Sequence, residues 1–544
     1  MSWGKRGSYA FLCLMTALGA ACRDSPNEDR FARSGTLVIG TTGDADMLFP
    51  PLIASSVGRQ ITEQIYDYLA GIGPEMNTIG DVGFRPQLAN SWQWSDDSLT
   101  IAFKIDPDAR WHDGRSVSAD DVRFTFQIYS DPNVGSSSGS QLGNIDSVST
   151  PDSHTAVFWF RRRSPLQFFD ATNQMQILPR HVFGGMTADS LRKNASAATP
   201  VGSGRFRFVS WKRGTSIELA PDTSNYRGRA KLQRVIWSII PSPIAASTML
   251  LAGDTDIYDA MRPENVREAA TNPNLKVVSS DGSDYVFLTF NFRNPKNQDR
   301  PHNLFASRDL RRALSIAVDR TSMVRNVFDS LALPGLGPTI RAFPTTDTTI
   351  EQLPFDVGRA SSLLDSLGWR AGSDGIRERN GRKLQFSILV PGSSLNRQKM
   401  AVLLQEQFRR IGASVSLDEV EFGTFSARLQ ARDFDTALAS FHLGASAGAV
   451  RETWTSAAAK ARGGLNYGWY MNPAFDALVD SATSAMDLPT SRNFYTAAYK
   501  IAIEDAPAIW LYEPKMVIGI NRRVTTKGMR ADAWWSALAE WDAQ

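Results

Sequence analysis

Residues 85–126 are the most informative stretch of the chain and read RPQLANSWQWSDDSLTIAFKIDPDARWHDGRSVSADDVRFTF. Apolar residues alternate with polar ones over Leu99–Ile105, which predicts a half-buried strand, and the acids at 96–97 predict the turn before it. Ser118, followed three residues later by Asp121, forms a capping box and predicts the start of a helix. The stretch therefore predicts a turn, a strand and a capped helix in one unit.

Strand and helix signals continue on both sides of this stretch. A buried strand is predicted over 36–42, and the apolar residues Val57, Ile61, Ile65 and Leu69 recur every four positions, as on one face of a helix. Further strands are predicted over 155–160, 205–209, 235–240, 286–290, 384–390 and 415–420, and strand character returns over 508–520. Longer helices are predicted over 308–328, 357–367, 395–411, 422–432, 474–486 and 490–504. The pattern indicates an α/β protein whose second half is a separate, helix-covered sheet.

The composition is that of a folded protein with several domains. Apolar residues make up 42% and charged residues 21% of the 544 residues, and this length predicts about three or four domains. Lys and Arg number 59 against 56 Asp and Glu; removal of Lys5 and Arg6 with a leader leaves 57 basic residues. This near-neutral balance argues against a nucleic-acid partner.

The N-terminus has the layout of an export signal followed by a tether. Two basic residues precede a short apolar segment, and small residues stand directly before Cys22. This order predicts a signal peptide over 1–21, and Cys22 resembles the lipidated cysteine of a bacterial lipoprotein; a plain cleaved signal is the alternative. Residues 22–35 are polar and predict a lipid-anchored, flexible tether. The other cysteine, Cys13, lies in the leader, so we expect no internal disulfide in the mature chain.

Catalytic and metal sites have little support in the sequence. The five histidines are scattered, and neither an HExxH-like nor a CxxC spacing occurs. Residues 135–139 match G-x-S-x-G formally, but Ser- and Gly-rich flanks predict a loop, whereas a nucleophile elbow lies between a strand and a helix. We therefore expect no enzyme activity, no metal site and no cofactor.

Several motifs resemble those of one known family. The order and spacing of residues 85–126 resemble the hallmark of the bacterial extracellular solute-binding proteins of family 5, the peptide- and nickel-type receptors of ABC importers. Four later segments are also similar to motifs of this family: 200–208, 252–257, 311–320 and 472–476. The resemblance thus covers almost the whole chain after the leader.

This resemblance implies an α/β fold of two lobes, like a type II periplasmic-binding protein, joined by a two-strand hinge. An extra domain is inserted in lobe one. Mapped onto this sequence, lobe one takes residues 36–75, 199–287 and 508–544, the extra domain takes 76–198, and lobe two takes 288–507.

The function implied by the resemblance is that of a substrate-binding lipoprotein of an ABC importer. Such a protein captures a small solute between its lobes, most often a peptide, and delivers it to a membrane permease. We expect a monomer in the periplasm or outside the cell membrane, held there by its lipid anchor. Sugars, opine-like compounds, siderophores and metal chelates remain open as ligands. An exported sensor or adaptor, or a hydrolase with the same fold, is the alternative function.

Candidate ligand-binding residues lie at strand ends and in aromatic runs. They are Asp44, Phe441, His442, Gly444, Tyr467, Trp469, Trp510 and Tyr512. Aromatic side chains suit a concave site, although core packing explains each one equally well. In peptide receptors of the family an aspartate shortly after the position of Phe441 holds the ligand's α-amino group, whereas residues 440–450 contain no acid here. Either another acid such as Asp44 supplies the countercharge, or the ligand is not a conventional free-amino peptide.

Overall fold

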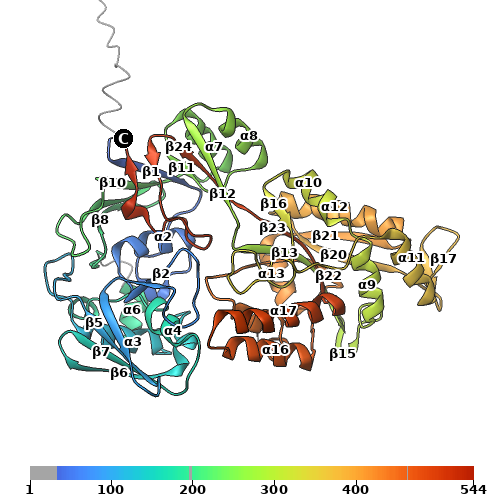
Figure 1. Cartoon of the computed structure of the whole chain (residues 1–544). Coiled ribbons are helices and arrows are strands. Elements are labelled where there is room, and N and C mark those ends of the chain that lie inside the picture. Colours follow the sequence, from blue (N-terminus) through green and yellow to red (C-terminus); the bar gives the residue numbers. More distant parts are fainter. Residues whose placement is uncertain (1–33, 195–198, 462) are drawn as a thin grey trace, which may run out of the picture.

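The computed structural model describes residues 34–194, 199–461 and 463–544. The predicted signal peptide, Cys22 and nearly all of the tether lie outside the described residues. Two bodies lie side by side, the first coloured blue to green and the second mainly yellow to orange (Figure 1). The chain therefore has the expected two-lobed α/β fold.

Lobe one is built on a seven-stranded mixed sheet with strand order β12-β24-β11-β1-β10-β9-β8. The strands are β1 (Thr36–Thr41), β8 (Phe206–Lys212), β9 (Ser216–Pro221), β10 (Arg234–Ile239), β11 (Ile257–Tyr258), β12 (Leu275–Ser280) and β24 (Met516–Asn521). The central strand β1 pairs in parallel with β10 and β11, and its Leu37 and Ile39 are buried. Because β24 comes from the far end of the chain, the predicted return of residues 508–520 to an earlier sheet is confirmed.

Helix α2 (Ser56–Ile65) carries the apolar stripe that was predicted after the first strand, and it is shorter than that stripe. Ser55 caps its start by accepting a hydrogen bond from the backbone N–H of Gly58. The backbone becomes extended at Tyr66, so Leu69 is not on the helix but is buried just before β2 (Ala70–Ile72). Two more helices, α7 (Pro243–Ala252) and α8 (Pro263–Thr271), complete the layer next to β11 and β12.

The extra domain contains an antiparallel four-stranded sheet with order β4-β5-β7-β6. Its elements are β4 (Ala89–Trp94), β5 (Thr100–Ile105), β6 (Ile145–Asp152), β7 (Thr155–Phe160), α3 (Ala119–Ser130) and α4 (Gln167–Asn173). The predicted capping box is confirmed, since the backbone N–H of Ser118 donates to the carboxylate of Asp121 over 2.8 Å. Phe103, Phe158 and Phe168 form the aromatic core between the sheet and α4.

Lobe two is a six-stranded sheet with order β16-β23-β13-β22-β20-β21. Its strands are β13 (Asp284–Phe290), β16 (Ala332–Pro334), β20 (Gln385–Pro391), β21 (Ser414–Val420), β22 (Thr436–His442) and β23 (Ala508–Pro514). The helices are α9 (Arg308–Ile316), α10 (Arg320–Phe328), α11 (Val357–Ser366), α12 (Leu395–Arg410), α13 (Phe422–Ala431), α14 (Ala449–Trp454), α15 (Ser456–Lys460), α16 (Pro473–Ser484) and α17 (Leu488–Asp505). The predicted long helices of this half are thus present, with one exception.

The single helix predicted over 308–328 is wrong, because this segment forms two helices. Helix α9 ends at Ile316, and the side chain of Asp319 accepts a hydrogen bond from the backbone N–H of Ser322 over 3.0 Å. A side chain that caps a new helix in this way cannot lie inside a continuous one.

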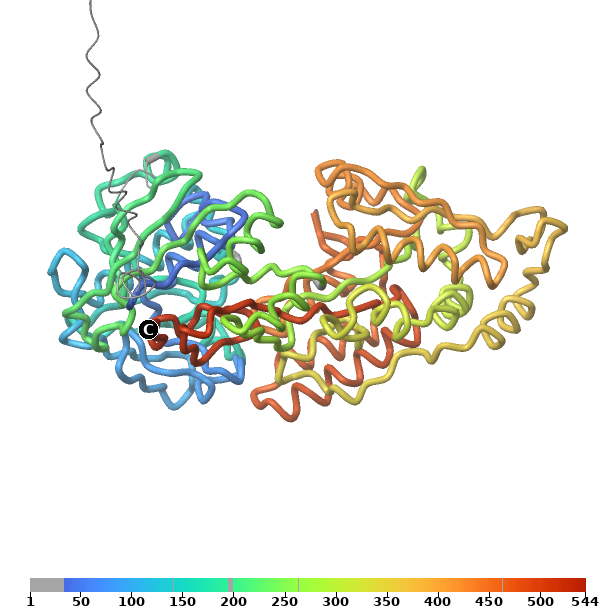
Figure 2. Tube along the Cα trace, turned by 90° about the horizontal axis from the view of Figure 1, so that it is seen from above, coloured from blue at the N-terminus to red at the C-terminus, as the bar shows by residue number. Residues whose placement is uncertain are grey.

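Two chain segments cross between the lobes and run side by side (Figure 2). One links β12 to β13 through residues 281–283, and the other links β23 to β24 through Lys515. Strand pairing therefore places β13 and β23 in the sheet of lobe two, whereas the predicted boundaries assigned 284–287 and 508–514 to lobe one. In the first crossing, the hydroxyl of Ser283 donates to the backbone oxygen of Ala531 over 2.9 Å.

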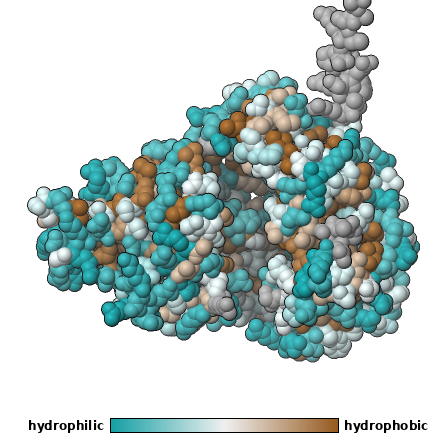
Figure 3. Space-filling model, turned by 180° about the vertical axis from the view of Figure 1, so that it is seen from behind, coloured by the Kyte–Doolittle hydropathy of each residue, from teal (hydrophilic) through white to brown (hydrophobic). Residues whose placement is uncertain are grey.

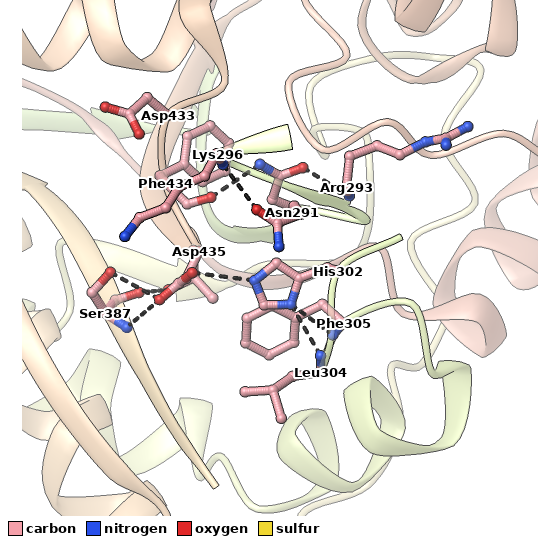
Figure 4. Close-up of polar contacts among 12 residues, drawn as sticks. Asn291, Arg293, Lys296, His302, Leu304, Phe305, Ser387, Asp433, Phe434 and Asp435 are labelled. Atoms are coloured by element: carbon pink, nitrogen blue, oxygen red, sulfur yellow. Dashed lines mark hydrogen bonds and ion pairs between the residues drawn. The ribbon is translucent and has the colours of Figure 1, made fainter. Parts of the chain in front are cut away.

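A polar cluster just before β22 ties the start of this strand to β20 and to His302 (Figure 4). Nε2 of His302 lies 3.1 Å from the carboxylate of Asp435, while its Nδ1 accepts hydrogen bonds from two backbone N–H groups. The backbone N–H of Ser387 donates to the same carboxylate over 3.0 Å. Since each of these groups has a partner here, the cluster has a structural role.

Candidate ligand-binding cleft

A cleft with a volume of about 720 Å³ lies between the two lobes. Figure 3 shows the molecule hollowed in this region. Lobe one, the extra domain and lobe two each contribute a wall. This volume lies within the range of roughly 300–1,000 Å³ that is typical of small-ligand sites.

The lobe-one wall carries a network of charged and aromatic side chains. Glu63 of α2 accepts hydrogen bonds from the indole N–H of Trp535 over 2.7 Å and from the hydroxyl of Tyr68 over 3.2 Å. Beside it, Arg530 binds the carboxylate of Asp532 through two hydrogen bonds of 2.8 and 3.1 Å. Burial raises the pKa of Glu63, and the Arg530 guanidinium only partly opposes that rise. The network brings the end of the chain to α2 and stiffens this wall.

The extra-domain wall is formed by helix α4 and the loops next to it, and it includes Asp170. The carboxylate of Asp170 has no hydrogen-bond or ion-pair partner among the residues that the structure describes. Burial raises its pKa to about 7, and burial is the one cause of the shift. This half-buried carboxyl group therefore has less water around it than a surface acid, and none of the described cations forms an ion pair with it.

The lobe-two wall consists of the end of β22, the loop after it, helix α14 and a few residues of later segments. Three predicted ligand residues, Phe441, His442 and Gly444, line the cleft here. Nδ1 of His442 lies 3.3 Å from the carboxylate of Asp284, its partner across β13 and β22. This hydrogen bond raises the pKa of His442. The wall thus offers an aromatic ring and an imidazole to a ligand.

Tyr467 and Trp510 support this wall from behind. The ring of Tyr467 stacks on that of Phe441, with 5.8 Å between the centroids. Trp510 is 1% exposed and its ring lies 5.7 Å from that of Trp454. Neither residue lines the cleft, so both act on it through the packing of its aromatic base.

The other three predicted residues also lie outside the cleft lining. The carboxylate of Asp44 accepts hydrogen bonds from the indole of Trp211 over 3.0 Å and from the backbone N–H of Gly214 over 2.8 Å. These bonds tie the loop after β1 to β8 and the turn before β9.

Trp469 lies under the guanidinium of Arg432, 3.9 Å from the ring centroid, and Tyr512 packs on Phe328 with 4.4 Å between centroids. Each aromatic group therefore has a packing role within lobe two.

Ser137, of the G-x-S-x-G match, does line the cleft, but it follows helix α3 and not a strand. Within residues 34–194, 199–461 and 463–544, no group of three His, Cys, Asp or Glu side chains could hold a metal ion. In the same ranges, none of the helices combines the length and the apolar character needed to cross a bilayer.

Sequence reasoning missed Glu63, Asp170, Arg530 and Trp535. Trp534-Trp535 is a conspicuous aromatic pair close to the chain end and could have indicated a site there. Asp170 follows two phenylalanines in an apolar run, and an acid in such surroundings is a signal worth testing.

Comparison with known proteins agrees with this architecture. A family model described as "Bacterial extracellular solute-binding proteins, family 5 Middle" matches residues 83–459. The chain is 27% identical over 518 residues to the oligopeptide-binding protein AppA of Bacillus subtilis (strain 168), covering 92% of each chain. It is 25% identical over 501 residues to the probable D,D-dipeptide-binding periplasmic protein DdpA of Escherichia coli (strain K12), covering 90% of each.

Solved structures show the same fold. The structure of Bacillus subtilis AppA in complex with a nonapeptide is similar with a TM-score of 0.75 and 25% identity, and covers 94% of this chain and 99% of that one. The structure of NikZ from Campylobacter jejuni in complex with Ni(L-His) has a TM-score of 0.76 at 23% identity, with the same coverage.

Proposed function

We propose, because the chain belongs to the bacterial extracellular solute-binding proteins of family 5, that it captures a short peptide between its lobes and delivers it to the permease of an ABC importer. The observation that carries this proposal is the cleft, whose walls come from both lobes and the extra domain. Its relatives AppA and DdpA are named as peptide-binding proteins, which favours a peptide over the other solutes that the family name allows.

Closure of the two lobes is the mechanism that we infer. A ligand that touches both walls binds the closed state better than the open one, so its binding shifts the population toward closure. The crossings at 281–283 and Lys515 are the natural hinge, because they are the short links between the two sheets. The permease then binds the closed conformation, and the ligand undergoes no chemical reaction.

We further infer that the protein is exported and anchored by lipid at Cys22, with residues 22–35 as the tether. The basic, apolar and small-residue order before Cys22 supports this inference. Replacing Cys22 with serine should release the protein from membranes without loss of ligand binding. Membrane retention of the serine variant, without lipid on the wild-type N-terminus, would contradict the anchor.

Native mass spectrometry of the freshly purified protein tests the proposed function. We expect a retained short peptide, or a rise in melting temperature when a pool of short peptides is added, since binding to the folded state stabilises it. The pool should be recovered uncleaved. A protein that retains no peptide, and whose melting temperature does not respond to the pool, would contradict a peptide receptor.

A further inference from the structure

The acidic side chains that line the cleft differ in whether other groups of the protein form hydrogen bonds with them. They are Glu63, Asp170, Glu452 and Asp532. Glu63 and Asp532 have hydrogen-bond partners within the lobe-one wall. Glu452, on α14, is exposed, so water can solvate it.

Asp170 has no such partner and only partial access to water. It lies on α4 between buried apolar residues, since Phe168, Phe169 and Ala171 are at most 8% exposed. Its backbone N–H donates to Leu166, but its carboxylate is without a partner in the described part of the chain. Burial raises its pKa, and none of the described arginines forms an ion pair with it. The charged form of a carboxylate that is only partly hydrated is disfavoured unless something else pairs with it.

The position of Asp170 in its helix does not explain this burial. Asp170 is in the first turn of α4, where the helix dipole favours a negative charge. An exposed position in the same turn would give the same benefit without removing the carboxylate from water. The helix is also only seven residues long, which keeps its dipole small.

Asp170 lies close to the place where the extra domain meets lobe two. A β-carbon on Gly448 of lobe two would lie 3.7 Å from the side chain of Leu166, one helical turn before Asp170. Closure of the cleft would therefore remove more water from Asp170. The lobe-two loop at 440–450 has no acid of its own, so a cation held between the lobes would not be neutralised from that loop.

We propose that Asp170 is the countercharge for a cationic group of the ligand, so that the receptor selects solutes with a free ammonium or a similar cation. This inference rests on the proposed receptor function and adds to it the chemical class of the ligand. An ammonium beside Asp170 forms a charge-assisted hydrogen bond, which is stronger in a water-poor site than at the surface.

The test compares two probes and three proteins. One probe is a pool of short peptides with free amino groups, and the other is the same pool after acetylation of every amine. The proteins are the wild type, Asp170→Asn and the control Asp108→Asn, which makes the same change at an exposed acid of the extra domain outside the cleft lining. Binding is measured by equilibrium dialysis with mass spectrometry, and the melting temperature of each ligand-free protein confirms that it is folded.

We expect the wild type and Asp108→Asn to bind the free-amino pool and to bind the acetylated pool far more weakly. Asp170→Asn should lose roughly 30-fold or more in affinity for the free-amino pool, as expected when one partner of a buried charge pair is removed. Equal binding of both pools by the wild type, or unchanged binding by a folded Asp170→Asn, overturns the inference while the receptor function stands. Binding of neither pool by the wild type overturns the peptide-receptor function and this inference together.

Discussion

A second, independent prediction for Asp170→Asn concerns the stability of the folded protein in the absence of ligand. The carboxyl of Asp170 has a pKa of about 7 in the folded protein against an ordinary value of 3.8. Between these two pH values, the carboxyl of Asp170 is therefore mainly protonated in the folded state and mainly ionised in the unfolded state. Stability from this proton is fully present below about pH 4 and is lost as the pH rises to about 7.

The size of the effect follows from the pKa difference. About three pKa units at roughly 1.4 kcal/mol each give an upper limit of about 4 kcal/mol. The side chain keeps some exposure, so solvent screening reduces the effect, and we expect roughly 2 to 4 kcal/mol. Asparagine is neutral at every pH, so the variant should not show this loss.

Chemical unfolding at about pH 5 and about pH 8 measures the difference. From about pH 5 to about pH 8, the unfolding free energy of Asp170→Asn should rise by roughly 2 kcal/mol or more relative to that of the wild type. Only the wild type must bury a charged carboxylate at the higher pH. The account of Asp170 would be refuted if the difference in unfolding free energy between the wild type and the variant were the same at both pH values. It would also be refuted if that difference shifted in favour of the wild type at about pH 8.

Three further predictions concern residues whose polar contacts lie within one lobe. Arg311 donates to three backbone carbonyls, so Arg311→Lys, which lacks the planar fork, should lose roughly 2 to 4 kcal/mol of unfolding free energy; an unchanged melting temperature would contradict this. Asp44→Asn should lower the melting temperature, at a cost of about 1 to 2 kcal/mol, and leave peptide affinity unchanged in calorimetry, because its carboxylate binds Trp211 outside the cleft; a weaker affinity would return Asp44 to the site. Despite burial, hydrogen bonds from His302 and Ser387 hold the pKa of Asp435 below its ordinary value of 3.8. Asp435→Asn should thus be destabilised at neutral pH, with a deficit that shrinks as the pH falls through the folded-state pKa, and a pH-independent deficit in thermal unfolding would be evidence against this role.

Local signals in the sequence predicted the elements that depend on neighbouring residues. The capping box at Ser118 and Asp121 and the stripe of α2 belong to this kind. The break between α9 and α10 was not predictable in the same way, because the apolar period continues across it. Only the side chain of Asp319, turned onto the next helix, shows that a new helix starts there.

The candidate site was predictable only in part. The family resemblance led to Phe441, His442 and Gly444, which line the cleft. It could not show that Asp44 turns toward β8, since that depends on where Trp211 lies in the folded sheet. Asp170 was missed for a similar reason: a first-turn acid usually faces water, and only the fold places this one in a cleft.

Small-angle X-ray scattering tests closure on a ligand, the central claim, most directly. Purified protein is stripped of retained ligand by unfolding and refolding and is then measured with and without the free-amino peptide pool. We predict that the radius of gyration decreases when the pool is added and saturates with its concentration, because the lobes close over the cleft. A radius of gyration that does not change while peptide is demonstrably bound would contradict closure as the mechanism.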